Sequence, residues 1–289
     1  MSYNDAKYSK GGSLHKLPAQ IPRKTFKLAM KWAQISHELI GCNSISRTDF
    51  RYEYEKTVHS LADSYKCKDV IITADGGSSR YRKAILPDYK QNRKDKYATQ
   101  TEEEKIAFEE FFEEYQATLD MLGAFLPILR FDGVEADDIA AHLVKNKDRY
   151  GFGEIWLISS DRDWDLLIQE GVSRFSYVNR KEVRIQNWYD HYEVSPEQYI
   201  SLKCLTGDKG DNVPGITGIG PKRAKDLIIA YGDAMNIYDS IPLPSKYKHI
   251  QELNARGEQI LQNYELMDLM SYCDDAIGSA NIEQIEERI

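Results

Sequence analysis

The sequence predicts an α/β protein with a mixed, mostly parallel central sheet flanked by helices. Two short apolar runs, residues 69–74 and 155–159, have the length of buried parallel strands. Each run is followed closely by a carboxylate, Asp75 or Asp161. In open α/β sheets, ligands bind beyond the carboxyl ends of the strands, so we expect a functional site at these two strand ends.

Periodicity and capping signals predict the remaining elements. Residues 50–65 repeat apolar or aromatic side chains at helix spacing. The stretch from Thr101 to Glu104 has the pattern of a capping box, which predicts the start of a helix that continues to Leu122. The other predicted elements are a first strand at residues 26–30, strands within residues 171–187, a helix over residues 195–205 and helices through residues 241–289.

Composition narrows the class of protein. The 289 residues carry a net charge of −8, which alone argues against a nucleic-acid partner, but the charges are distributed so unevenly that their local arrangement decides. The four cysteines are far apart and form no Cys-x-x-Cys pair, as in reduced cytosolic proteins. No apolar stretch reaches membrane-spanning length, and residues 2–12 lack the apolar core of a signal peptide. We expect a cytoplasmic protein without membrane contact.

Acidic residues gather at several predicted strand and helix ends. Carboxylates crowded in this way repel one another unless a cation lies between them, and all-oxygen sites suit Mg²⁺ or Mn²⁺. For any one cluster, a helix cap or a solvated turn is the alternative interpretation. The candidate metal ligands are Asp75, Glu135, Asp137, Asp138, Asp161, Asp163, Asp208 and Asp211.

Basic residues and tyrosines alternate after Asp75. Cations can follow a phosphate backbone, and aromatic rings can stack on unpaired bases, so this segment predicts nucleic-acid binding. The alternative is a solvated charged face. The candidate DNA-binding residues here are Arg80, Arg82, Lys83, Tyr89, Lys94 and Lys96, and Lys90 and Arg93 lie in the same segment.

Residues 215–232 have the glycine spacing of a helix–hairpin–helix. Gly218 and Gly220 precede a predicted helix, and its backbone N–H groups can bind a phosphate. Lys222 and Arg223 add positive charge. Many DNA-binding proteins carry this pattern, and a purely structural turn is the alternative.

Four motifs together resemble the 5′ nuclease (flap endonuclease) family, with the greatest likeness to the T5-type phage enzymes. They are Gly-Val-Glu-Ala-Asp-Asp, Leu-Ile-Ser-Ser-Asp-Arg-Asp-Trp-Asp, the run from Gly207 to Gly220, and Leu-Pro-x-Tyr-Lys-x-Asn-Arg. The likeness extends from Val70 to the C-terminus. It implies a structure-specific 5′-3′ exonuclease and flap endonuclease that hydrolyses DNA with two or more divalent ions.

The resemblance also implies roles for individual segments. Residues 80–100 would lead into a helical arch, and Lys90 and Arg93 would meet the scissile phosphate. The glycine hairpin would form a helix–three-turn–helix that holds K⁺ and grips duplex DNA. We expect a monomer, in the host cytoplasm if a phage encodes it. The expected divisions are a flexible tail at 1–23, a catalytic domain at 24–200 and a DNA-binding region at 201–289.

The first predicted strand departs from the family pattern. The family has a metal-binding aspartate at its end, which by spacing falls near residues 31–33, where this chain has Lys31 and no aspartate. This departure leaves open a protein that binds DNA junctions without cleaving them. A nuclease that acts on RNA–DNA hybrids is a third possibility, because the same site would serve both substrates.

Overall fold

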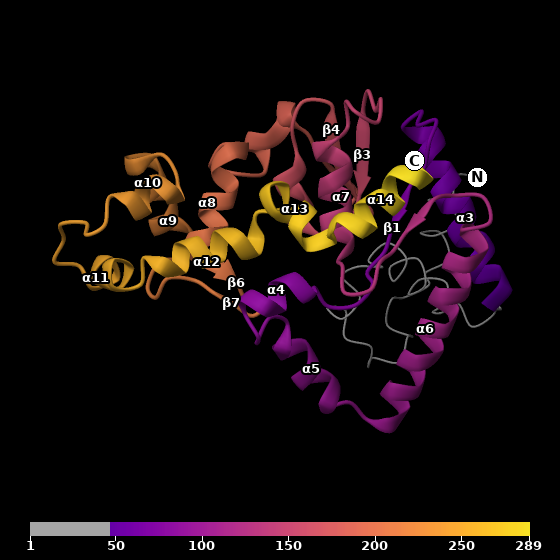
Figure 1. Ribbon diagram of the computed structural model, residues 1–289, viewed down its shortest axis with the longest axis horizontal. Coiled ribbons are helices and arrows are strands. Elements are labelled where there is room, and N and C mark those ends of the chain that lie inside the picture. Colours follow the sequence, from indigo (N-terminus) through magenta and orange to yellow (C-terminus); the bar gives the residue numbers. More distant parts are fainter. Residues whose placement is uncertain (1–46) are drawn as a thin grey trace.

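The fold is described from a computed structural model, which covers residues 47–289 (Figure 1). The predicted tail, the strand at residues 26–30 and Lys31 lie outside the described residues. The described chain is a mixed α/β protein, as predicted. Its helices and strands are α3 (Arg47–Ser64), β1 (Ile72–Thr73), α4 (Arg80–Ile85), α5 (Gln91–Ala98), α6 (Glu102–Leu122), β2 (Ile128–Leu129), α7 (Ala136–Lys145), β3 (Ile155–Ile158), η1 (Arg162–Leu167), β4 (Val172–Ser176), β5 (Lys181–Val183), η2 (Ile185–Asp190), α8 (Pro196–Thr206), β6 (Gly207–Asp208), β7 (Val213–Pro214), α9 (Pro221–Tyr231), α10 (Ala234–Asp239), α11 (Lys248–Ala255), α12 (Glu258–Met267), α13 (Leu269–Ile277) and α14 (Ser279–Arg288).

The strands of the described residues form three short ladders rather than one continuous sheet. β1 pairs in parallel with β2, and β3 pairs in parallel with β4, whose other edge pairs antiparallel with β5. β6 and β7 form a separate antiparallel pair. The parallel pairing that the apolar runs predict is therefore present, but β1 and β2 are only two residues long and do not reach the β3–β4–β5 ladder.

Helix α7 is the central element of the acidic half of the molecule. It is buried along most of its length and packs against α13, β1 and η1. Its apolar side chains divide between two core clusters, one around Leu157 of β3 and the other around Leu129 of β2. Because α7 begins beside the end of β1 and lies against η1, its first turn brings Asp137 close to both Asp75 and Asp161.

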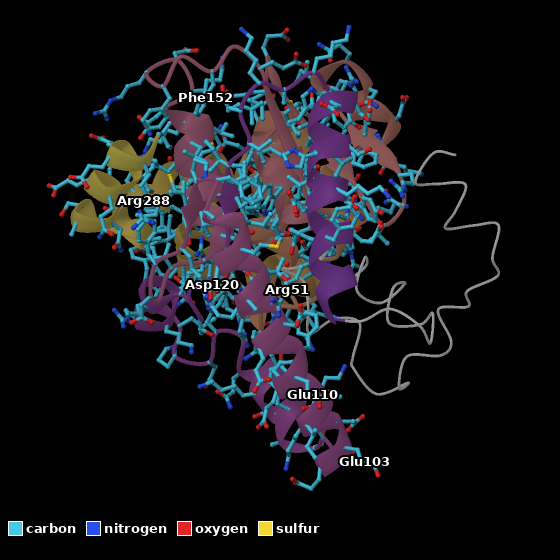
Figure 2. The ribbon with its side chains drawn as sticks, turned by 90° about the vertical axis from the view of Figure 1, so that its right-hand side faces the viewer. Arg51, Glu103, Glu110, Asp120, Phe152 and Arg288 are labelled. Carbon is cyan, nitrogen blue, oxygen red and sulfur yellow. The ribbon has the colours of Figure 1, made fainter. Side chains whose placement is uncertain are left out.

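Helices α5 and α6 extend away from this body. The end of α5 and the start of α6 meet at the point farthest from the body, so the two helices form the two sides of an arch (Figure 1). The capping box predicted at Thr101 and Glu104 is present at the start of α6. Glu103 and Glu110 point outward from the distal part of α6 (Figure 2). Nearer the body, Arg51 of α3 donates to Glu114 of α6 at 2.6 Å, which fixes that end of the arch.

The C-terminal helices form a second packed body beside the arch base. Helix α12 packs against α8 and α10, and α9 packs against α8 and α10. Leu205, Ile228, Leu253 and Ile260 are among the fully buried side chains of this core. The predicted helices beyond residue 241 are thus present. No helix among residues 47–289 is long and apolar enough to span a bilayer.

Candidate active site

Asp75 follows β1, and two contacts fix its position. Its Oδ1 accepts a hydrogen bond from the backbone N–H of Ala136 at 2.7 Å. Its carbonyl oxygen accepts from Nε of Arg130 at 2.9 Å. The first contact uses an N–H of the first turn of α7, which has no partner within the helix. It ties the end of β1 to the start of α7, beside Glu135.

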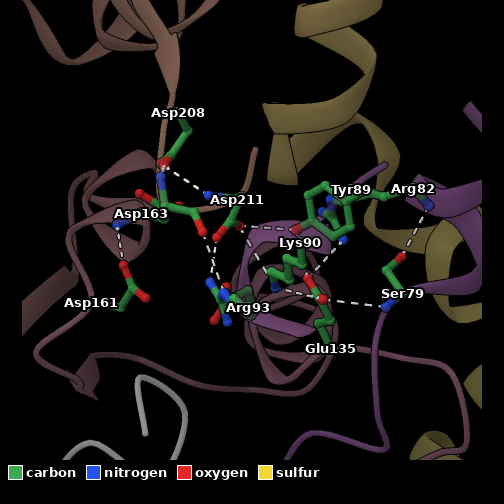
Figure 3. A network of polar contacts seen from close by, with 12 residues as sticks. Ser79, Arg82, Tyr89, Lys90, Arg93, Glu135, Asp161, Asp163, Asp208 and Asp211 are labelled. Atoms are coloured by element: carbon green, nitrogen blue, oxygen red, sulfur yellow. Dashed lines mark hydrogen bonds and ion pairs between the residues drawn. The ribbon is translucent and has the colours of Figure 1, made fainter. Parts of the chain in front are cut away.

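Glu135 is the N-cap residue of α7, and it is 1% exposed. Its Oε1 accepts from Nζ of Lys90 at 2.6 Å and from the backbone N–H of Ser79 at 3.2 Å (Figure 3). Its Oε2 accepts from the hydroxyl of Tyr89 at 3.0 Å. A buried carboxylate needs this number of donors, because an unpaired charge in the interior is strongly unfavourable.

Asp138 pairs with a buried arginine instead of facing the other acids. Its two carboxylate oxygens each accept from the Arg82 guanidinium at 2.7 Å, and Arg82 is only 3% exposed. Nε of Arg82 also donates to the carbonyl of Leu266 at 2.8 Å. A DNA contact requires an exposed side chain, and Arg82 is buried. The prediction that Arg82 binds DNA is therefore wrong. The pair fixes α4 against α7, and it occupies both oxygens that Asp138 could offer to an ion.

Asp161 and Asp163 lie on the tight turn that connects β3 to η1. Oδ1 of Asp161 accepts from the backbone N–H of Asp163 at 3.1 Å, which caps η1. Beneath the turn, Asp165 receives two donors from Arg174 of β4, at 2.5 and 2.8 Å, and Arg174 also donates to the carbonyl of Ser159 at 2.9 Å. This buried pair holds the turn against the β3–β4 ladder.

Lys203 connects Asp163 of η1 with Asp208 of β6. Its Nζ donates to Asp163 at 2.8 Å and to Asp208 at 3.3 Å. Oδ1 of Asp208 in turn accepts from the backbone N–H of Gly210 at 2.7 Å and of Asp211 at 3.2 Å. Lys203 is not among the site residues predicted from the sequence. Its only local signal is its place near the end of α8, five residues before Asp208.

Lys90 and Arg93 lie at the base of the arch and both contact Asp211. Nζ of Lys90 is 3.6 Å from Oδ2 of Asp211, and Arg93 donates to its Oδ1 (Figure 3). The oxygen of the Tyr89 hydroxyl is 3.0 Å from the same carboxylate, so its single proton is shared between Asp211 and Glu135. Tyr89 is only 4% exposed, so its ring is not available for the base stacking that the sequence suggested. It instead joins Asp211 to Glu135.

Crowding and burial perturb the acids at this site. Burial, together with the neighbouring Glu135, raises the pKa of Asp75 to about 7. Burial also raises the pKa of Asp137 well above its usual range, and the nearby Asp161 adds to the effect. Burial would raise the pKa of Glu135 too, but the charges of Lys90 and Arg82 together outweigh burial and lower that pKa. These are the shifts expected where acids outnumber the cations between them.

A cavity of about 20 Å³ lies among the acids, which is enough space for one water-sized species. Carboxylates line one side of the cavity, and their oxygens suit a hard divalent cation. The rest of the lining consists of Tyr89, Arg82 and the apolar side chains of Val213, Leu266, Met267 and Leu269. Among the described residues, no three acid, histidine or cysteine side chains already converge as a metal site. Lys90, Arg93 and Lys203 pair with them instead. The acids around the cavity are Glu135, Asp137, Asp163, Asp208 and Asp211.

The remaining predicted basic residues of this segment are at the surface or half-buried. Arg80 pairs with Asp132, and both side chains are mostly exposed. Lys83 lies beside Lys94, and partial burial, followed by the charge of Lys94, lowers the pKa of Lys83. Lys94 and Lys96 are exposed on α5. Lys83 and Lys94 thus lie together near the buried Lys90.

The glycine hairpin begins just after β7. Gly218 has a φ of +80°, a conformation that favours glycine, and the N-cap of α9 is Gly220. The space around the Cα of Gly220 is open. Arg223 donates to the carbonyl of Gly218 at 2.6 Å, and Lys222 is exposed beside it. The hairpin therefore presents a helix N-terminus and two cations to solvent.

This fold and this arrangement of acids and cations identify a class of nuclease. The chain belongs to the 5′-3′ exonuclease family. A model of its N-terminal resolvase-like domain matches residues 37–197, and a model of its C-terminal SAM fold matches residues 194–286. The chain is thus a metal-dependent 5′ nuclease, and these matches do not favour a junction-binding protein without activity.

Comparison with individual proteins supports the same family. The chain is 42% identical to the flap endonuclease of Escherichia phage T5 over 84% of its length and 83% of that protein's. It is 27% identical to the 5′-3′ exonuclease of Buchnera aphidicola subsp. Schizaphis graminum over 76% of this chain and 73% of that one. A structure of the phage T5 protein with metal ions aligns with a TM-score of 0.77 at 43% identity, covering 83% of this chain and 89% of that one. A complex of the phage T5 flap endonuclease with DNA and metal ions gives 0.80 at 42% identity, covering 84% and 90%.

Proposed function

We propose that this protein hydrolyses phosphodiester bonds of DNA at 5′ flaps and other 5′-ended branches, with two or more bound Mg²⁺ or Mn²⁺ ions. The single observation that carries the proposal is that acids from three separate segments line one cavity, and that two of them, Glu135 and Asp211, contact the buried Lys90. The phage T5 relative is named a flap endonuclease, and one of its structures contains DNA and metal ions, which supports the same substrate and cofactor here.

The carboxylates around the cavity and their neighbours would hold the ions. Bound divalent ions supply a hydroxide nucleophile at neutral pH and stabilise the leaving oxygen. Asp138 would act indirectly, because Arg82 occupies both of its oxygens. The proposed ligands, direct or through water, are Asp75, Glu135, Asp137, Asp161, Asp163, Asp208 and Asp211.

Lys90 and Arg93 would receive the scissile phosphate. Both are cations already desolvated against Asp211, so a phosphate can take the place of that carboxylate without a large loss of hydration. Lys90 stays protonated, because Glu135 and its other acidic neighbours outweigh burial and raise the pKa of Lys90. The two side chains would offset negative charge that accumulates on the phosphoryl oxygens.

Two exposed surfaces would bind DNA away from the bond that is cut. Lys83, Lys94 and Lys96 would contact the strand that enters the arch, with Arg80 at its edge. The hairpin would grip the backbone of the downstream duplex through the N-terminus of α9, helped by a K⁺ ion. We propose that one chain carries both surfaces and acts as a monomer. The proposed hairpin contacts are Gly218, Gly220, Lys222 and Arg223.

A substrate panel tests this function. The full chain is incubated with Mg²⁺ and end-labelled DNA that has a 5′ flap, a 3′ flap or a blunt duplex end, and with an RNA–DNA hybrid. We expect the 5′ flap to be cut fastest, near its junction, with no cleavage when EDTA is in excess. Equal rates on 5′ and 3′ flaps would contradict the proposal, and preferential cleavage of the hybrid would reassign the substrate.

A further inference from the structure

Two segments that lie far apart in the sequence are joined at the arch base by hydrogen bonds that involve no charged partner. They are residues 88–93, which lead into α5, and residues 208–212, which connect β6 to β7. The backbone N–H of Lys90 donates to the carbonyl of Asp211 at 2.9 Å. Nδ2 of Asn92 donates to the carbonyl of Lys209 at 2.9 Å. Nδ2 of Asn212 donates back to the carbonyl of Asp88 at 2.8 Å. We call these three contacts the amide clasp.

The backbone at both ends of the amide clasp is in an uncommon conformation. Lys90 has a φ of +58° and Asn212 a φ of +60°. Asparagine is among the few residues that adopt this conformation readily, and lysine is not. The strained turn at Lys90 directs its side chain inward to Glu135. Contacts on either side of this turn are therefore needed to keep it, because such a conformation persists only where its surroundings over-determine it.

The charged contacts across the same two segments cannot provide that stability during the reaction. Lys90 and Arg93 both bind the carboxylate of Asp211, and in the proposed function both transfer to a phosphate. Once they leave, Asp211 no longer holds the arch base through its side chain. The amide clasp uses only main-chain carbonyls and neutral donors, so the exchange of ionic partners leaves it intact.

The amide clasp is also rigidly connected to the glycine hairpin. β7 follows Asn212 directly, and the carbonyl of Pro214 accepts from Nδ2 of the buried Asn263 at 2.8 Å. The backbone N–H of Ile216 donates to the carbonyl of Leu205 at 2.9 Å. The hairpin at Gly218 thus cannot move relative to residues 208–212 without breaking contacts to α8 and α12. The clasp carries this fixed spacing across to Lys90.

We propose that Asn92 and Asn212 are positioning residues that set where the protein cuts, by fixing the distance between the duplex-binding hairpin and Lys90. This inference rests on the proposed function. With the clasp intact, a duplex seated on the hairpin presents one phosphate to Lys90. Without it, the arch base shifts relative to the hairpin, and neighbouring phosphates compete for the same position.

The test combines Asn92→Ala with Asn212→Gly in the full chain. Asn92 and Asn212 are both exposed, and glycine adopts a positive φ without strain, so the double variant removes the two amide donors and keeps the backbone conformation. Asn212→Asp is a second variant of nearly the same shape that cannot donate. The matched control is Asn281→Ala on α14, which removes a comparable amide donor to the carbonyl of Ile277 at the end of α13.

The first readout is the distribution of cleavage products from an end-labelled 5′ flap, at single-nucleotide resolution. We expect one dominant cut for the wild type and for Asn281→Ala. We expect the cuts of the double variant and of Asn212→Asp to spread over adjacent phosphates. The single-turnover rate of the double variant should fall about tenfold, as the loss of two ordinary hydrogen bonds implies, and that of Asn212→Asp should fall less, because it loses one. Unchanged product positions in the double variant would overturn the proposal.

The second readout does not depend on cleavage. Hydrogen exchange of the metal-free protein without DNA reports on the N–H of Lys90, which the clasp protects. We expect faster exchange in residues 88–94 of the double variant and no change in α7. Faster exchange throughout the chain would overturn the proposal, and so would exchange in residues 88–94 at the wild-type rate. If the wild type cuts no 5′ flap, the proposed function fails, but this measurement still decides whether the clasp holds the arch base.

Discussion

Replacing Lys90 with alanine should slow the chemical step far more than it weakens DNA binding. The Lys90 ammonium lies 2.6 Å from Glu135 and 3.6 Å from Asp211, and its side chain is only 7% exposed. In the proposed function its contact with the phosphate strengthens as charge builds on the phosphoryl oxygens. Loss of one such preorganised donor lowers a rate by roughly 10²–10³-fold, or about 3–4 kcal/mol. Alanine, like lysine, has a Cβ, so the positive φ of this residue adds no new strain.

The substitution also has a structural effect that the assay must separate. Removing one partner of a buried ion pair is destabilising by roughly 3–5 kcal/mol when the other charge is left alone. Here Glu135 keeps Arg82 at 3.6 Å, and Asp211 keeps Arg93, so we expect about 2–3 kcal/mol, below the range for an isolated charge. The free energy of unfolding of Lys90→Ala, from urea titration, provides this control.

The assay measures the single-turnover rate with enzyme in excess and, in EDTA, the dissociation constant for the same 5′ flap at fixed salt. An interaction made only in the transition state lowers the rate and leaves the dissociation constant nearly unchanged. We expect a rate loss of at least about 10²-fold with an affinity change within about threefold. A variant that loses only affinity would show that Lys90 is an ordinary backbone contact, and would refute its role at the scissile phosphate.

Three further predictions follow from the same geometry. Lys222→Ala, on the exposed end of α9, should weaken DNA binding about equally for all duplex sequences and reduce its salt dependence, with a near-normal rate at saturation; a selective rate loss would contradict this role. Lys203→Met should make Mn²⁺ raise the melting temperature more than in the wild type, because Asp163 and Asp208 lose their shared cation; an equal or smaller shift would count against the competition between Lys203 and the metal. The pKa of Asp75 is raised to about 7 in the metal-free fold, so the folded protein retains a proton between about pH 4 and 7 that the unfolded chain has lost, and this contribution to stability declines as pH rises through that range. Metal must displace that proton, so Mn²⁺ affinity by calorimetry should rise from pH 6 to pH 8, and a flat profile would exclude Asp75 as a ligand.

The main features of this site could be predicted from the sequence because they are local. An apolar run of four or five residues forms β3, and the next carboxylates lie at its end because the strand terminates there. Glu135 directly precedes an amphipathic run, and α7 begins at the next residue, Ala136. The glycine spacing around Gly218 predicts the start of a helix after Gly220, and α9 begins at Pro221.

The partners of the buried charges could not be predicted, because they depend on contacts across the fold. Arg82 and Asp138 are separated by 56 residues, and nothing in the local sequence distinguishes this arginine from its exposed neighbours. The sequence predicts a stacking ring at Tyr89 for the same reason, because it shows the aromatic side chain and not its burial. Lys203 looks like any helix lysine until the fold brings Asp163 to it.

The most direct test of the proposed site is to replace Asp161 and Asp163 individually with asparagine, which preserves shape and removes charge. Each variant is compared with the wild type for single-turnover cleavage of a 5′ flap in Mg²⁺, and for the affinity of the same DNA in EDTA. Loss of a carboxylate ligand should abolish most cleavage, by roughly 10²-fold or more, while DNA binding stays within a few-fold of the wild type. Wild-type cleavage rates in both variants would show that the turn after β3 does not belong to the catalytic site.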